Sequence, residues 1–598
     1  MSPSPSSPSP VPIIKAVPFS LPAEILGVIA RALPAEDWYA CILVNKEWSI
    51  EFTSIFYRSV TLRTDRQCAL FYDALLESSR RLGYYTRELC ILAPDPPLMM
   101  LKELSHLCPF LTQLDLPQNI RGHIYDLAAL PLSFTLLSSL SYLCVTSNLA
   151  DFSWLESLSQ LTYLSIQWVS TEWSMELVTD LHAWCPQLQS LQLIIKSISM
   201  ITKPTLSSSR ILRRDLIINQ HHKHHRQQQS DGSNKTTALT VRSVKIYLPI
   251  ELVHPLVADW LDFCATTYPN LKHLTIGLEI GHELMNHQRI NPFAFNNNVK
   301  NTLLSSMSTF AQTCHYLKSI ELENFGEYYR LLQIINRYDR RLERIEIKDP
   351  YELVAWTLFA ESTKSSKDSL DTLTIASFRD FLPGIEYGLL QHVQTLANLS
   401  RLTLTDCMNR ISIDKLLHAA PKLKYLCLVA TYLVTTTTTT PYIEKHDSLE
   451  ILEFKRNSVS QPVLRYINQH CHRLRQLSIE CTSIPPMADD INQESHISLP
   501  NLDLKKITLH GVSRKTVIPD ADSFIGVKKS ITMDSFKWYH TGKDTCENEK
   551  SRGVLGYPEL PCYTKELVLK VKKDNVFVLL INCRSLQQLY FNDIRLVI

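Results

Sequence analysis

The sequence predicts an α/β solenoid, a stack of strand–helix repeats, with a small all-α unit in front of it. Three observations predict this fold class. A phrase of the form LxxLxL, with Ile, Val or Phe allowed at the later positions, recurs through most of the chain after residue 107. Its copies between Leu317 and Leu474 follow one another at intervals of 24–29 residues. Before the repeats, residues 21–56 place large apolar side chains at helical spacing.

The phrase predicts one strand in each repeat. The alternation within LxL puts two side chains on one face of a strand and the residue between them on the other. The rest of each period returns as a helix, as in VQTLANLSRLTL. A short period with this phrase is typical of a leucine-rich repeat, so we expect a horseshoe whose parallel strands line a concave, protein-sized surface.

Clear and weaker copies of the phrase cover the chain from the end of the N-terminal unit to the C-terminus. The clear copies begin at Leu111, Leu140, Leu161, Leu188, Leu271, Leu317, Leu342, Leu370, Leu399, Leu423, Leu449, Leu474 and Leu586. The weaker copies begin near Leu89, at Val241, at Leu504 and near Leu567.

A cysteine often stands three residues before the leading leucine. It does so at Cys108, Cys185, Cys314, Cys471 and Cys583, whereas Leu158, Tyr268, Ala420 and His446 occupy the same offset in other copies. A small, apolar cysteine suits a buried turn between helix and strand. We therefore expect these thiols to be core residues without chemistry.

Composition and charge bear on the compartment and the class of partner. The formal net charge is +2, so no global basic field is available to hold nucleic acid or an anionic membrane. No run of 18 apolar residues is present, and the Pro/Ser-rich N-terminus lacks the layout of a secretory signal. The fifteen cysteines include no CxxC pair. We expect a cytoplasmic or nuclear protein with free thiols, and neither a nucleic-acid nor a membrane partner.

Motifs for catalysis and cofactor binding are missing from the sequence. It contains only 14 glycines and no GxGxxG, Walker A, GxSxG or HExxH motif. The histidines of residues 221–225 could hold a metal ion loosely, but no second ligand cluster fixes a geometry. We expect no catalytic residue, no cofactor and no specific metal site, and hence a protein that is not an enzyme.

The N-terminal segment predicts three short helices. Pro22 can begin the first, and Pro34 the second. The third would carry Trp48, Phe52 and Phe56 along one stripe. Three helices of ~40 residues in total are marginal alone, so a partner or the next domain must cover the remaining apolar surface.

Residues 18–62 resemble an F-box. The resemblance rests on LPAEIL, on Ile29 and Leu33 after it, and on AEDWYACILVNKEW with its VNKxW ending; Trp38 stands where the family more often has leucine. The cysteine-containing phrase is likewise similar to the repeats of F-box/leucine-rich-repeat proteins. The resemblance implies docking onto a Skp-type adaptor, and through it a cullin, in an SCF ubiquitin ligase. The implied adaptor-binding residues are Leu21, Pro22, Ile25, Leu26, Ile29, Leu33, Trp38, Cys41, Val44 and Trp48. In the alternative reading, all ten are ordinary core residues of a helical cap.

The predicted domain organisation follows from these segments. It comprises a Pro/Ser-rich disordered tail at 1–17, the F-box at 18–62, a linker helix within 63–84, and a leucine-rich-repeat solenoid at 85–598 with insertions at about 202–236, 430–441 and 510–560.

The resemblance implies a non-catalytic, substrate-recognition subunit. The F-box would hold one end on the adaptor while the concave repeat face binds an unknown target protein for ubiquitination. Two alternatives remain: a scaffold or inhibitor that acts without ubiquitin transfer, and a receptor for a small ligand. The receptor would need a basic cluster on the concave strands. The outward positions sampled for such a cluster are mixed in character: Gln113, Asp115, Glu321, Glu343 and Thr403.

Overall fold

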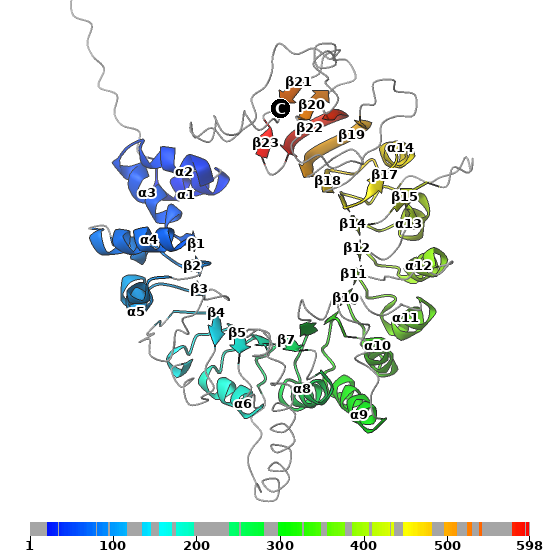
Figure 1. Cartoon of the computed structure of the whole chain (residues 1–598), viewed down its shortest axis with the longest axis horizontal. Helices are drawn as coiled ribbons and strands as arrows, with labels where there is room; N and C mark the ends of the chain where they lie inside the picture. Colours follow the sequence, from blue (N-terminus) through cyan, green and yellow to red (C-terminus); the bar gives the residue numbers. More distant parts are fainter. Residues whose placement is uncertain are drawn as a thin grey trace, which may run out of the picture. The chain divides into compact units, whose positions relative to one another are not determined.

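The computed structural model of the chain divides into two compact units, Met1–Gln189 and Ser190–Ile598 (Figure 1). The residues that the structure describes are 21–33, 35–78, 81–93, 96–116, 134, 136–144, 155–169, 175–196, 238–249, 253–279, 297–325, 328–348, 356–376, 385–405, 410–430, 432–435, 446–480, 495–510, 523–528, 537–540, 577–591 and 594–596. Within these ranges, no helix combines the length and the apolar character that crossing a bilayer requires.

The first unit consists of three helices followed by a parallel sheet. The helices are α1 (Ala23–Ala32), α2 (Ala35–Ile42) and α3 (Lys46–Phe56). After them come β1 (Ser59–Leu62), α4 (Asp65–Glu77), the 3-10 turn η1 (Leu82–Tyr84), β2 (Glu88–Ile91), α5 (Leu98–Leu107), β3 (Gln113–Asp115), β4 (Ser139–Cys144), β5 (Tyr163–Val169) and α6 (Met175–Trp184). Strands β1 to β5 pair in chain order, and every pairing is parallel.

Strand β1 corrects the predicted start of the solenoid. Val60 pairs with Leu89 of β2, so YRSVTL at residues 57–62 is the first copy of the repeat phrase, with Tyr57 in the place of the leading leucine. The sheet therefore begins at Ser59 and not at residue 85, and α4 occupies the position of the first repeat helix. The ring of Tyr57 stacks on Phe71 of α4, with centroids 6.3 Å apart, so the three helices run into the repeats without a flexible linker.

Strand register also corrects the copy that forms β4. Leu140 pairs with Leu114 on one side and with Leu164 on the other, which makes it the fourth residue of its phrase. This copy therefore begins at Leu137 and not at Leu140. Leu137 is buried, as a leading leucine should be.

The second unit continues the same strand–helix alternation. Its parallel ladder contains β6 (Ser190–Lys196), β7 (Ser243–Pro249), β8 (His273–Glu279), β9 (Ser319–Glu323), β10 (Arg344–Lys348), β11 (Thr372–Ala376), β12 (Arg401–Thr405), β14 (Tyr425–Val429), β16 (Ile451–Lys455), β18 (Gln476–Glu480), β19 (Ser495–His510) and β22 (Phe577–Phe591). Its helices are α8 (Val253–Thr267), α9 (Asn297–Thr313), α10 (Tyr328–Arg337), α11 (Trp356–Ser362), α12 (Ile385–Thr395), α13 (Ile413–Ala419) and α14 (Gln461–His470).

The helices of the second unit lie on one side of its ladder (Figure 1). We call the other side, which none of the described helices covers, the open face. A small second sheet of β13 (Arg410–Ser412), β15 (Tyr432–Val434) and β17 (Ser458–Val459) accompanies three of the repeats. Beyond it, β20 (Ser523–Lys528) pairs in parallel with β22, while β21 (Lys537–His540) and β23 (Ile594–Leu596) add antiparallel pairs.

The core is built from the apolar positions of the phrase. In the copy that forms β9, Leu317, Ile320 and Leu322 are each at most 3% exposed. The same three positions are buried in the neighbouring copies, and equivalent residues pair across successive strands. The leucine-rich-repeat solenoid predicted from the phrase is confirmed by this register and burial.

The turn position before the phrase is buried in every copy singled out from the sequence. Cys108, Cys185, Cys314, Cys471, Cys583, Leu158, Tyr268, Ala420 and His446 are all buried. Burial raises the pKa of Cys108, Cys185, Cys314 and Cys471 to about 12. These thiols are protonated at neutral pH, and a thiol is a poor nucleophile or metal ligand in that form. The interpretation as core residues is confirmed.

The C-terminal copies are direct neighbours despite their distance in sequence. Ile507 of β19 pairs with Leu589 of β22, so the copies beginning at Leu504 and Leu586 are adjacent in the ladder. The weaker copy near Leu567 lies outside the described residues, as do the tail at 1–17 and the insertion at 202–236. Most of the insertions predicted at 430–441 and 510–560 also lie outside them.

Candidate functional site

The three N-terminal helices form a small core of their own. Leu26 and Ala30 of α1 and Phe52 of α3 are almost completely buried. Two contacts fix the helices around them. The indole Nε1 of Trp38 donates a hydrogen bond to the carbonyl oxygen of Ala30 at 2.9 Å, which joins α2 to α1. The ring of Trp48 stacks on that of Phe52 with centroids 5.3 Å apart.

The Asn-Lys-Glu-Trp segment places the start of α3. Asn45 is extended and its side-chain oxygen accepts the backbone N–H of Trp48 at 2.9 Å, so it satisfies one of the free donors at the helix start. Glu47 lies in the first turn, where the helix dipole favours an acid. The cap thus sets the point at which Trp48 and Phe52 enter the core.

Replacing Asn45 with alanine is expected to destabilise α3 by about 1 kcal/mol, because the Trp48 amide loses its partner. Hydrogen exchange of the α3 amides should accelerate about fivefold. The matched variant Lys46→Ala, one residue further on, leaves the cap intact and should change exchange by less than twofold or so. Equal exchange in the two variants would contradict the capping role.

The ten residues predicted to bind an adaptor do not share one environment. Leu26 is 1% exposed, which corrects its assignment to a contact surface: its side chain belongs to the core because it faces Phe52. Six others are half-buried and pack against that core, namely Leu21, Ile29, Leu33, Trp38, Cys41 and Trp48. Only Pro22, Ile25 and Val44 are exposed. A unit this small uses most of its large side chains to hold itself together.

An apolar surface nevertheless remains on these helices. Seven large apolar side chains between residues 25 and 56 are 41–69% exposed: Ile25, Val28, Tyr39, Leu43, Val44, Ile50 and Phe56. Ile25 and Val28 lie three apart on α1 and so share a helix face, while Leu43 directly follows the last residue of α2. Five of the seven were not in the predicted set. Val28 is the one of these five on α1, and its signal in the sequence was its position on the stripe opposite Leu26 and Ala30.

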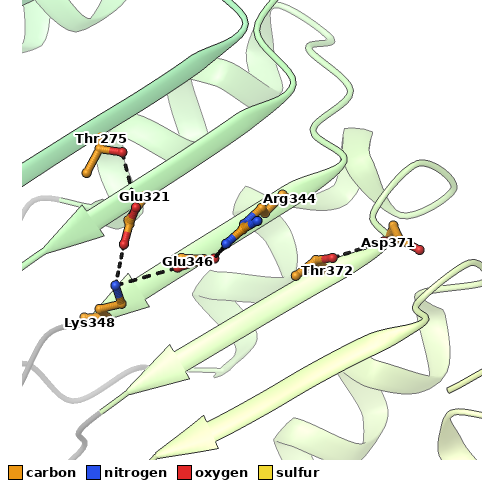
Figure 2. Close-up of polar contacts among 7 residues, drawn as sticks. All are labelled: Thr275, Glu321, Arg344, Glu346, Lys348, Asp371 and Thr372. Carbon is orange, nitrogen blue, oxygen red and sulfur yellow. Dashed lines mark hydrogen bonds and ion pairs between the residues drawn. The ribbon is translucent and has the colours of Figure 1, made fainter. Parts of the chain in front are cut away.

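The open face of the second unit carries a network of polar and charged side chains across β8, β9 and β10 (Figure 2). Thr275 donates a hydrogen bond to Glu321 at 3.2 Å, and Glu321 forms an ion pair with Lys348. Lys348 also lies 3.7 Å from Glu346, which pairs in turn with Arg344. Two acids and two bases therefore compensate one another within this network.

Burial and pairing act in opposite directions on the pKa values of the network. Partial burial by itself would raise the pKa of Glu321, but the hydrogen bond and charge of Lys348 outweigh it and hold that pKa below its ordinary value. Partial burial would lower the pKa of Lys348, and the carboxylates of Glu321 and Glu346 outweigh it and raise that pKa. Both groups are therefore charged at neutral pH, and the network braces the strands.

Among the described residues, no three His, Cys, Asp or Glu side chains come together in a group that could hold a metal ion. The histidines of residues 221–225 lie outside those residues.

Comparison with known proteins gives structural similarity only. No family model and no curated protein matches the sequence. Solved structures that it is similar to include a TLR13–ssRNA13 complex, at 12% identity and a TM-score of 0.38, with 77% of this chain and 62% of that chain covered. This chain therefore spans less than two thirds of the length of that chain.

Two further solved structures are leucine-rich-repeat proteins. A Leptospira interrogans LRR protein matches at 16% identity and a TM-score of 0.28, with 66% of this chain and 79% of that chain covered. The LRR ectodomain of the Arabidopsis thaliana receptor kinase GASSHO1/SCHENGEN3, in complex with CASPARIAN STRIP INTEGRITY FACTOR 2, matches at 13% identity and a TM-score of 0.26, with 72% and 47% covered. These scores carry no argument about function, and the assignment of the fold rests on the repeat and register of this chain.

Proposed function

We propose that the chain is a substrate-recognition subunit of an SCF-type ubiquitin ligase, in which helices α1–α3 dock onto a Skp-type adaptor and the repeats bind a target protein. The observation that carries the proposal is the apolar surface left on those helices, together with the F-box-like order of LPAEIL and VNKEW. Seven exposed large apolar side chains on three short helices and the turn between α2 and α3 are what a second polypeptide would cover. The leucine-rich-repeat fold supplies a broad binding surface of the kind that solenoids use for protein partners.

The proposed mechanism is tethering. The adaptor and cullin would hold this chain near a ubiquitin-loaded conjugating enzyme, and the repeats would hold the target on the same complex. Target lysines would then meet the enzyme at high effective concentration, so that a bimolecular encounter becomes effectively intramolecular. No nucleophile of this chain is needed. A cytoplasmic or nuclear location is part of the proposal.

The test uses the exposed positions. Leu21 packs against the core, so its replacement would mix folding with docking, whereas Ile25 and Val44 are exposed and can be changed without opening the core. The full-length chain with Ile25→Asp and Val44→Asp is expected to lose capture of a purified Skp-type adaptor by more than about tenfold, because two charges would enter an apolar interface.

The matched control has Leu70→Asp and Leu76→Asp. These leucines are equally exposed, at 58% and 53%, and lie on α4 of the same unit. The control should retain capture and a wild-type melting temperature. Undiminished capture by the Ile25/Val44 variant, or equal loss in the control, would refute docking through α1–α3. Proteins that accumulate on the Ile25/Val44 variant in affinity purification with mass spectrometry would be candidate targets.

A further inference from the structure

Charge is unevenly distributed along the strands of the second unit, with basic side chains at the start of the strands and acidic side chains further along. In each copy, the second and third residues of the phrase stand where the strand begins, and the fifth and seventh follow on the open face. From β7 to β19, nine basic side chains occupy the second and third positions: Arg242, Lys272, Lys318, Arg344, Arg401, Lys424, Arg475, Lys505 and Lys506. We call these nine residues the basic edge. Only three carboxylates share the two positions: Glu343, Asp371 and Glu450.

The later positions of the same strands have the opposite balance. Five carboxylates stand at the fifth and seventh positions from β7 to β19, against three lysines. The carboxylates are Glu321, Glu323, Glu346, Glu453 and Glu480, and the lysines are Lys245, Lys348 and Lys455. Two of these lysines are held in ion pairs, Lys348 with Glu321 and Glu346, and Lys455 with Glu453 and Glu480. The net positive charge therefore lies along the start of the strands, and the net charge of the later positions is negative.

Backbone hydrogen bonds hold this strip in a fixed row. From Arg242 to Arg475, the carbonyl oxygen of each second-position residue accepts two N–H groups from the next repeat. The carbonyl of Lys424 binds Glu450 and Ile451, and that of Arg475 binds Lys505 and Lys506, at 2.8–3.1 Å. Successive second-position residues are therefore spaced as neighbouring strands are, at about 4.8 Å. The charges are displayed on rigid backbone and not on loops.

Much of the basic edge is free to meet a partner. Seven of its nine side chains are exposed, and only Lys272 and Lys506 are half-buried. Lys424, Arg475 and Lys505 take part in none of the ion pairs among the described residues. The guanidinium of Arg401 lies over the ring of Tyr425, 5.0 Å from its centroid. The positive charges of the basic edge also act on a neighbouring histidine. Partial burial lowers the pKa of His273, and the charges of Lys272 and Arg344 lower it further.

We propose that the basic edge is the docking site for an acidic, extended segment of a partner protein. The strip is one or two residues wide and runs across many strands, which suits a single extended chain rich in Asp and Glu. A nucleic-acid duplex would lay further phosphates over the later strand positions, where five carboxylates would repel them. This inference deepens the proposed function. It rests on that function only for what happens to the bound protein, and not for the binding itself.

The test measures binding of a fluorescent ten-residue glutamate peptide to the full-length chain. Wild type is expected to bind it, with affinity that falls steeply as salt rises. The variant with Lys424→Gln, Arg475→Gln, Lys505→Gln and Lys506→Gln should bind at least about tenfold more weakly. Its matched control removes four exposed charges from the helix side of the same unit, by Arg337→Gln, Lys364→Gln, Lys415→Gln and Arg465→Gln, and should bind as wild type does.

Three results would overturn the inference. They are failure of wild type to bind the peptide, equal weakening in the two variants, and tighter binding of a ten-residue thymidine oligonucleotide than of the peptide. Circular dichroism and thermal unfolding verify that both variants are folded. The adaptor plays no part in this measurement, so loss of peptide binding and loss of adaptor docking are distinguishable failures.

Discussion

Replacing Leu26 with alanine is expected to lower the free energy of unfolding of helices α1–α3 by about 2–5 kcal/mol. The same replacement at Ile25, the preceding residue, is expected to cost less than about 0.5 kcal/mol. Leu26 is 1% exposed and packs with Ala30 and Phe52, whereas Ile25 is 47% exposed. Truncation at Leu26 removes buried methyl groups and leaves a cavity, and truncation at Ile25 does neither.

Hydrogen exchange with mass spectrometry on peptides from residues 21–56 measures this difference directly. The α1–α3 amides of Leu26→Ala should exchange at least about thirtyfold faster than wild type, and those of Ile25→Ala should be nearly unchanged. Both Leu26→Ala and Ile25→Asp are expected to weaken adaptor capture, but for different reasons. Leu26→Ala would unfold the docking surface, whereas Ile25→Asp would place a charge in the interface and leave the helices intact. Similar exchange in the two alanine variants would show that the core is not centred on Leu26 and Phe52.

The contrast between Ile25 and Leu26 shows which property of the candidate site the sequence could not predict, namely which apolar side chains of α1 are buried and which are exposed. Both residues belong to the apolar stripe of α1, and the periodicity correctly predicts a helix there. Which part of the stripe faces α3 depends on how the helices cross, and periodicity does not contain that information. The prediction therefore placed Leu26 on the contact surface and left out Val28, which is 57% exposed.

The repeats were more predictable because the phrase itself carries their strand positions and their core. Leu317, Ile320 and Leu322 are buried as the pattern requires, and so is the preceding Cys314. The two errors have local causes. The stretch LSSLSYL offers two overlapping frames three residues apart, and only pairing with neighbouring strands selects the frame beginning at Leu137. The first copy begins with Tyr57 and so escapes a search for leucine.

The basic edge was missed for a related reason. Outward residues sampled singly, such as Gln113, Glu343 and Thr403, are mixed in charge. The segregation appears only when every copy is aligned and each position of the phrase is compared down the ladder. The sequence does contain a signal for the basic edge. This signal is the lysine or arginine at the second position of several copies, as in Lys272, Lys318 and Lys424.

Lys348→Met is expected to destabilise the second unit by about 1–3 kcal/mol at pH 7. This is less than the cost of breaking a fully buried ion pair, because the side chain of Lys348 is 38% exposed. In wild type, Lys348 holds the pKa of Glu321 below its ordinary 4.5, so this carboxylate contributes stability above that pH and loses the contribution as pH falls through its folded-state pKa. Without Lys348, only Lys245 and Thr275 remain to oppose the effect of burial, and the pKa of Glu321 rises. With a raised pKa, the ionised carboxylate of Glu321 lowers the stability of the fold at neutral pH. This loss of stability diminishes as the pH falls, because the carboxylate is then protonated.

The difference between variant and wild type should therefore be largest at pH 7 and shrink toward pH 4.5, as measured by urea unfolding across that range. Lys318→Met is the matched control. Lys318 pairs with Glu343 at 2.6 Å, but both side chains are about half exposed, at 48% and 52%, so its loss should cost less than about 1 kcal/mol with little dependence on pH. A Lys348→Met penalty that is the same at pH 7 and pH 4.5 would mean that the lysine stem packs against the open face and that its charge does not stabilise Glu321. The ion-pair network would then be a consequence of strand register and not a brace of it.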